Sequence, residues 1–135
     1  MESRVQQALE RHHKGYNCAQ AVACTYGDLV HNSEDQMFRM AEGFGAGMGG
    51  MQSVCGAVSG AVLLAGLANS GGLQQRTKGV TYQLSKAIME GFVQKNGTAV
   101  CEQLKGIGTG NVLRSCDGCI EDACKLAEQT LFSEK

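Results

Sequence analysis

Cysteine is the residue type with the greatest capacity for chemistry in this sequence. The 135 residues contain seven cysteines, an odd number: Cys18, Cys24, Cys55, Cys101, Cys116, Cys119 and Cys124. No basic segment followed by an apolar one opens the chain, so we expect a cytoplasmic protein. Thiols stay reduced in the cytoplasm, and redox chemistry or metal binding therefore suits these cysteines better than a disulfide framework. Cys24 and Cys124 lie in apolar helical patterns, where we expect them to be small buried hydrophobic residues.

Cys116 and Cys119 form a CxxC pair. Ile120 follows the pair in place of the histidine of a c-type haem attachment site, so we expect no haem. No predicted strand precedes the pair, which disfavours a thioredoxin-like site, and structural zinc typically uses two such pairs. A metal ion or cluster could still combine this pair with Cys18, Cys55 or Cys101.

The glycine-rich segment 43–50 contains the pattern GxGxxG. A dinucleotide site requires a preceding strand and an acidic residue about 20 positions later. A predicted helix precedes this segment, and no acidic residue lies between Glu42 and Glu90, so we expect no nucleotide. Close backbone packing around Cys55 is the favoured role, and binding of an anion or cluster by Gly45, Gly47 and Gly49 is the alternative.

Histidine and acidic side chains are weaker candidates. We expect His12, His13 and His31 to be solvated residues at helix ends, with metal ligation as the alternative. The acidic residues near the C-terminus, Glu121, Asp122 and Glu128, are predicted to form a solvated helix face without a catalytic carboxylate pair.

The elements that position these residues are predicted to be helices, because apolar residues recur at 3.6-residue spacing without strict alternation. Polar capping residues mark the predicted helix starts, two of them with a glutamine three residues later. These residues are Ser3, Asn17 with Gln20, Ser33 with Gln36, Thr98 and Ser115. We expect one domain over residues 1–135, a compact all-α bundle of five to six helices.

The centre of the chain is uncharged over 33 residues, 43–75. Its apolar stretch, residues 54–68, is shorter than the roughly 20 residues that cross a membrane, so we expect a Gly/Ala-rich helix in the core or in a subunit interface. Gly56 and Gly60 lie four residues apart on one face of it and would let another backbone approach closely. A later helix carries an apolar stripe, at Val80, Leu84, Ala87, Ile88, Gly91 and Phe92, and ends at Asn96-Gly97 with a left-handed cap.

Four cysteines fall in the first turns of predicted helices: Cys18, Cys55, Cys101 and Cys116. Unpaired backbone N–H groups and the positive end of the helix dipole favour the thiolate there. Thiolate is the form that attacks disulfides and binds metals. We therefore assign the chemistry to these four cysteines.

Composition excludes some partners. The net charge is −1 and the pI is near 6.3, which gives no general attraction to nucleic acid or to acidic membranes. We expect neither as a partner.

The sequence resembles a family of small redox-active proteins named for a C…GCAxxG…C…C cysteine pattern. The matching segments are 17–22 (NCAQAV), 43–49 (GFGAGMG), 55–61 (CGAVSGA), 101–106 (CEQLKG) and Cys116 with 120–123 (IEDA). The resemblance implies that Cys18, Cys55, Cys101 and Cys116 are the family's four cysteines. The central motif here is CGAxxG, with cysteine and glycine transposed, and Cys119 leaves open which member of the CxxC pair is functional.

The family is also similar to the helical part of split-Soret cytochromes, which are dimeric proteins with haem and an iron–sulfur centre. The haem motif is missing here, so the resemblance implies the fold, a homodimer and, as one alternative, an iron–sulfur cluster. It implies redox activity without naming an electron partner or a substrate.

The leading hypothesis is a redox protein, an oxidoreductase or electron carrier, whose four cysteines converge from four helix ends. They would act by thiol/disulfide exchange or as ligands of an iron–sulfur cluster. One alternative is a non-enzymatic module that binds zinc or a cluster, and another is a structural helical dimer with incidental cysteines.

Overall fold

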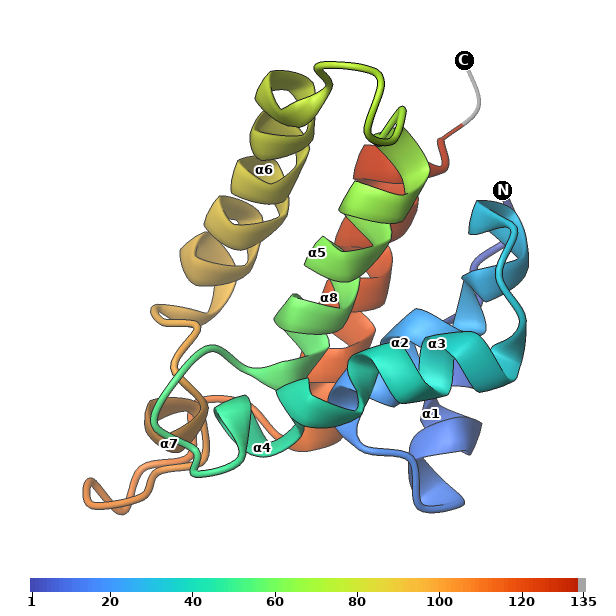
Figure 1. Cartoon of the computed structure of the whole chain (residues 1–135). Coiled ribbons are helices and arrows are strands. Elements are labelled where there is room, and N and C mark those ends of the chain that lie inside the picture. The colour runs from blue at the N-terminus through green and yellow to red at the C-terminus, as the bar shows by residue number, and fades with distance from the viewer. Residues whose placement is uncertain (134–135) are drawn as a thin grey trace.

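The computed structural model describes residues 1–133 and is built from helices (Figure 1). The α-helices are α1 (Val5–His13), α2 (Cys18–Thr25), α3 (Glu34–Ala41), α4 (Gly45–Met48), α5 (Gly56–Asn69), α6 (Lys78–Asn96), α7 (Cys101–Leu104) and α8 (Cys116–Leu131). Two 3₁₀ turns, η1 (Gly27–Val30) and η2 (Glu42–Phe44), flank α3. Within residues 1–133, six helices have eight residues or more, and the predicted all-α fold of five to six helices is confirmed.

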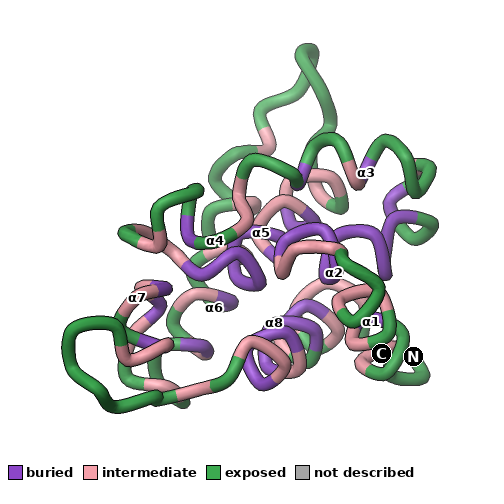
Figure 2. Tube along the Cα trace, turned by 90° about the horizontal axis from the view of Figure 1, so that it is seen from below, coloured by how far each residue is buried: buried purple, intermediate pink, exposed green. Residues whose placement is uncertain are grey.

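Three long helices, α5, α6 and α8, pack against one another, and α1, α2 and α3 lie beside them (Figure 1). The helix α2 contacts α5, α1 and α3, so it joins the two groups. Both α5 and α8 begin at the lower end of Figure 1, where α4 and α7 also lie, and Figure 2 is seen from that end. The molecule therefore gathers several helix starts at one end.

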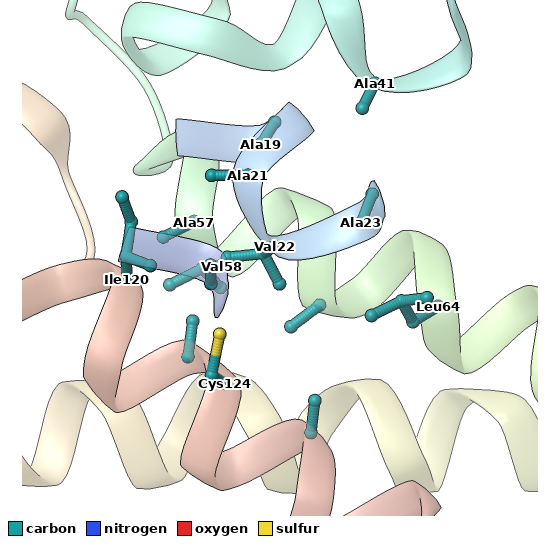
Figure 3. Packing of buried hydrophobic residues seen from close by; sticks show 14 of the residues in the cluster. Ala19, Ala21, Val22, Ala23, Ala41, Ala57, Val58, Leu64, Ile120 and Cys124 are labelled. Atoms are coloured by element: carbon teal, nitrogen blue, oxygen red, sulfur yellow. The ribbon is translucent and has the colours of Figure 1, made fainter. Parts of the chain in front are cut away.

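Small residues determine how closely α2 and α5 approach. A Cβ atom at Gly60 would lie 2.7 Å from the carbonyl oxygen of Ala19, and one at Gly56 would lie 3.3 Å from the Ala19 nitrogen. The alanines and valines around this contact are fully buried (Figure 3). The predicted close backbone approach at Gly56 and Gly60 is therefore present, with α2 as the neighbour.

The helix α6 packs through Ile88 and Phe92, which are fully buried, whereas Val80 is 53% exposed. The predicted places of Val80 and Ala87 in the apolar stripe are wrong, because both residues are exposed. Because each residue turns an α-helix by about 100°, steps of four residues drift by about 40°, and Val80 lies about 80° around the helix from Ile88.

Local capping signals are largely realised. Asn17 with Gln20 and Ser33 with Gln36 form capping boxes, and the hydroxyl of Ser115 accepts a hydrogen bond from the N–H of Gly118. Gly97 ends α6 with φ +85°.

Two predicted caps differ from the structure. The helix α1 begins one residue later than its predicted cap Ser3 implies, after Arg4. Thr98 does not cap α7, which begins after Val100, because an isolated antiparallel bridge between Val54 and Val100 keeps this stretch extended.

Asp122 is buried, which corrects the predicted solvated position. Its carboxylate accepts hydrogen bonds from Arg114 (3.0 Å), Lys95 (2.5 Å) and Asn96 (3.1 Å). Burial raises the pKa of this carboxyl, but the bonds from Arg114 and Lys95 outweigh burial and lower it overall. The network ties the end of α6 and the segment before α8 to α8, and so holds both ends of the stretch that carries α7.

No helix within residues 1–133 has the length and apolar character needed to cross a membrane.

Candidate functional site

Five cysteines lie near one another at the end of the molecule where helices begin. We call Cys18, Cys55, Cys101, Cys116 and Cys119 the thiol cluster. Three of them are first residues of helices, namely Cys18 of α2, Cys101 of α7 and Cys116 of α8. Cys55 precedes α5 as its N-cap residue, and Cys119 lies one turn into α8. The predicted placement at helix starts is correct within one or two residues.

Backbone hydrogen bonds fix two of these helix starts relative to each other. The N–H of Cys55 donates to the carbonyl of Ala99 (2.7 Å), and the N–H of Cys101 donates to the carbonyl of Ser53 (2.8 Å). The chain around Cys55 and the chain around Cys101 are therefore paired although 46 residues separate them in sequence.

The thiol cluster contains an inner and an outer pair. Cys55 and Cys119 lie close enough for each to shift the pKa of the other, and they are 1% and 0% exposed. Cys18 and Cys116 also lie close together, since Cys116 acts on the pKa of Cys18, and both are partly exposed. Cys101 is 6% exposed and lies close enough to Cys55 and Cys116 for their charges to act on it. The two pairs also interact, because Cys18 responds to the charge of Cys55.

The pKa of the Cys55 thiol is lowered from its usual 9.0 to about 6. The hydrogen bond from Cys119 is the largest cause, burial opposes it, and the backbone N–H groups of Ala57 and Val58 at the start of α5 contribute further. The lowered pKa favours the thiolate form of Cys55. The interaction with Cys55, followed by burial, raises the pKa of Cys119. Cys119 therefore remains a thiol and acts as the donor to Cys55.

The other helix-start cysteines do not follow the expected effect of the helix dipole. Burial raises the pKa of Cys18 to about 12, and the charges of Cys116 and Cys55 add to this. Burial likewise raises the pKa of Cys101, followed by the charge of Cys55. The expectation of a lowered pKa is wrong for these two thiols, because loss of solvation outweighs the field of a helix end.

Lys105 supplies the positive charge of the cluster and was missed in the sequence. Its Nζ lies 3.4 Å from Sγ of Cys119 and 3.4 Å from the carbonyl oxygen of Arg114. Burial alone would lower the pKa of Lys105, but its interactions with the sulfurs of Cys119, Cys116 and Cys55 outweigh burial and raise that pKa. A signal was present, since a residue four positions after Cys101 lies on the same helix face.

The glycine-rich segment 43–50 packs against Cys101, whereas the sequence predicts packing around Cys55. A Cβ atom at Gly47 would lie 2.5 Å from Cβ of Cys101, and Gly47 has φ +55°. Gly45 lies against the side chain of Asn17, whereas a Cβ atom at Gly49 would meet nothing within 4 Å. Close backbone approach is thus required at Gly47.

The remaining cysteines lie outside the thiol cluster. Cys24 and Cys124 are buried in the core, as predicted, and Figure 3 shows Cys124 on α8 among the buried hydrophobic residues. Burial raises the pKa of Cys24 to about 11 and that of Cys124 to about 12.

The donor set of the thiol cluster is suited to metals that prefer sulfur. Among the described residues, no three cysteine sulfurs lie within 4.8 Å of one another. Thiolates around one zinc ion, each at about 2.3 Å, stand about 3.8 Å apart. In a four-iron cluster each thiolate binds a different iron, so wider spacing is needed. The described cysteines therefore do not place three sulfurs at the spacing that one zinc ion requires.

Comparison with known proteins gives a family-level result. Residues 16–130 match the family described as "Putative redox-active protein (C_GCAxxG_C_C)". Neither the curated proteins nor the solved structures contain a match. The matched range includes all five members of the thiol cluster and Lys105.

Proposed function

The chain belongs to the C_GCAxxG_C_C family of redox-active proteins, and on this premise we propose that it is an oxidoreductase or electron carrier that works by thiol/disulfide exchange. The inner pair, Cys55 and Cys119, stores two electrons as a dithiol. The outer pair, Cys18 and Cys116, exchanges with an external disulfide or dithiol. Cys101 stands beside both pairs.

The observation that carries this proposal is that Cys55 lies beside Cys119 and has a lowered pKa, which favours its thiolate. Exchange begins with attack by a thiolate, and the best attacking thiol has a pKa near the ambient pH. Cys55, with a pKa of about 6, meets this condition. Burial separates the roles of the pairs, because a partner protein can reach Cys18 and Cys116 but not Cys55.

Two successive thiol/disulfide exchanges move the disulfide from the outer pair to the inner pair. An external disulfide first oxidises the outer pair to a Cys18–Cys116 disulfide and leaves as a dithiol. The Cys55 thiolate attacks Sγ of Cys18, the Cys18–Cys116 bond breaks, and Cys116 leaves as a thiolate that takes the proton of Cys119.

Cys119, now a thiolate beside Lys105, attacks Sγ of Cys55. The Cys18–Cys55 bond breaks, and Cys18 takes a proton from water. The inner pair has then lost two electrons and the outer pair has gained them.

Thiol counting tests the exchange scheme. Anaerobic reduced protein is titrated with oxidised glutathione, and free thiols are counted in the denatured protein. We expect a loss of two thiols and then of four in the wild type and in the control Cys24→Ala, which lies outside the cluster. Cys55→Ala should lose no more than two. A Cys55→Ala variant that loses four would overturn the inner pair.

An iron–sulfur cluster is the second candidate function, favoured by the fifth thiol. Cys18, Cys55, Cys101 and Cys116 would hold it, with Cys119 as the alternative to Cys116, and a bound cluster would supply one-electron transfer. Anaerobic purification with iron and sulfide analysis tests this. Cys101→Ala separates the two candidates, because it should abolish iron binding by a cluster but leave the thiol losses of the exchange scheme unchanged.

A homodimer in the cytoplasm completes the proposal. Two apolar side chains of α6, Val80 and Tyr82, are more than half exposed and are available for contact with a second copy. Light scattering coupled to size exclusion should give twice the chain mass of 14.3 kDa.

A further inference from the structure

Two histidines and one aspartate converge outside the thiol cluster. His12 and His13 are the last residues of α1, and Asp117 is the second residue of α8. Nδ1 of His12 lies 3.1 Å from Oδ1 of Asp117, and Nε2 of His13 lies 2.8 Å from Oδ2. One atom from each side chain falls in a group whose members are all within 4.8 Å of one another. We propose that His12, His13 and Asp117 bind a divalent transition-metal ion.

The distances suit such an ion. Imidazole nitrogens and carboxylate oxygens bind zinc-like ions at about 2.1 Å, so neighbouring ligand atoms stand about 3.0–3.4 Å apart. The two His–Asp distances are close to this range, and small side-chain rotations would admit the ion. Two imidazoles and one carboxylate leave coordination positions open for water or a further ligand.

The convergence depends on the packing of α1 against α8. Adjacent residues on a helix point about 100° apart, so His12 and His13 cannot meet at an ion through α1 alone. Asp117 lies between them and bonds both rings. The start of α8 does not need this carboxylate as a cap, since the Ser115 hydroxyl already accepts the N–H of Gly118 (3.0 Å).

The site is open to solvent and differs chemically from the thiol cluster. The side chains of His12, His13 and Asp117 are 24%, 60% and 47% exposed, so an ion can enter without opening the fold. Nitrogen and oxygen ligands suit zinc, iron, cobalt or nickel ions, whereas thiolates select softer ones.

Cobalt(II) is the probe for this site, because thiolate ligands give it an intense charge-transfer band that nitrogen and oxygen ligands do not. Co²⁺ is titrated into the reduced full chain under anaerobic conditions, and binding is followed by calorimetry and absorbance. We expect one equivalent to bind without the charge-transfer band, in addition to any ion held by cysteine.

Two variants and two matched controls complete the test. His13→Gln and Asp117→Asn should each weaken Co²⁺ binding at this site by more than about tenfold. That is the smaller cost of changing residues that only support metal ligands. His31→Asn and Asp35→Asn, exposed residues of the same types outside the site, should bind as the wild type does; asparagine tolerates the φ of +62° at position 31. Far-UV circular dichroism checks that each variant is folded. The two ligand variants test the site from different helices, because His13 lies on α1 and Asp117 on α8.

Loss of this equivalent in both ligand variants, with both controls unchanged, supports the site. The proposal is overturned if Asp117→Asn binds as much Co²⁺ as the wild type does. It is also overturned if the Co²⁺ that is lost in this variant shows the thiolate charge-transfer band. In that case the three residues form a hydrogen-bonded contact between α1 and α8 without a metal.

Discussion

The acidity of Cys55 depends on a few hydrogen-bond donors and one cation. Cys119 and the first N–H groups of α5 stabilise the thiolate directly, and Lys105 acts through its charge. The charge of Lys105 also opposes the rise in the pKa of Cys18, Cys101 and Cys119, which burial and neighbouring groups nevertheless raise overall. This one residue thus favours the reactive form of several thiols in the cluster.

Replacing Lys105 should therefore change redox behaviour more than stability. In Lys105→Met the pKa of Cys55 should rise toward its usual value, so the thiolate fraction at pH 7 should fall. Lys105→Arg, which keeps the charge, should restore most of that fraction. Ultraviolet absorbance of the thiolate against pH measures both. If the thiolate titration of Lys105→Met equals that of the wild type, Lys105 does not contribute to the acidity of Cys55.

Cys55 also predicts a pH dependence of stability. Its pKa is about 6 in the folded protein against a usual 9.0, so the unfolded chain binds more protons between these values. The contribution of Cys55 to the free energy of unfolding should increase from pH 6 to pH 9 and be lost as the pH falls through 6. Urea denaturation under reducing conditions should show the difference between wild type and Cys55→Ala growing over this range. Cys24→Ala, whose thiol has a raised pKa, should show no such growth; parallel behaviour of the two variants would contradict the account.

At the level of elements, the contact between α2 and α5 positions Cys18 next to Cys55. This contact depends on the missing side chain at Gly60, as the 2.7 Å distance to the Ala19 carbonyl shows. Gly66, on the same helix, has open space at its Cβ position. The two glycines therefore form a matched pair for testing the helix contact.

Gly60→Ala should destabilise the protein by about 1–3 kcal/mol, because the added methyl group pushes α2 and α5 apart. Gly66→Ala should be neutral or stabilise it by up to about 1 kcal/mol through helix propensity. Chemical denaturation of both variants measures these free energies. Equal effects of the two substitutions would show that the close approach does not matter.

The Asp122 network is the element that holds α6 and the segment before α8 together. Asp122→Asn removes the buried charge that Arg114 and Lys95 bond and should cost about 1.5–3 kcal/mol, the range for hydrogen bonds to a charged group. Glu121→Gln is the control, since Glu121 bonds Arg114 and Lys125 at the surface and should change stability by less than about 1 kcal/mol. Thermal unfolding distinguishes them, and a mild effect of Asp122→Asn would mean that this anchor is dispensable.

For the whole molecule, local features could be predicted and long-range ones could not. The capping boxes at Asn17 and Ser33 depend on residues three apart, so the sequence alone reveals them. The pairing of Cys55 with Cys119 depends on how α5 packs on α8, and no local pattern encodes it. The burial of Asp122 was equally unpredictable, because it lies on a polar face of α8. Its burial depends on Arg114 and Lys95, which bond it from other parts of the chain.

The cluster itself was predictable as a set of helix-start cysteines, but its internal order was not. Helix starts alone favoured a thiolate at each of four positions, whereas burial raises the pKa of Cys18 and Cys101. The family pattern led to Cys116 as the CxxC member of the site. The structure gives both members a neighbour, with Cys116 beside Cys18 and Cys119 beside Cys55.

Disulfide mapping of the mildly oxidised protein tests the central claim most directly. Trypsin leaves Cys55 as the one cysteine of peptide 40–76, and Cys116, Cys119 and Cys124 together in peptide 115–125. After oxidation by glutathione disulfide under anaerobic conditions, mass spectrometry should find these peptides joined and fragmentation should place the link at Cys119. A Cys55 peptide that stays reduced while other cysteines are oxidised would contradict the account.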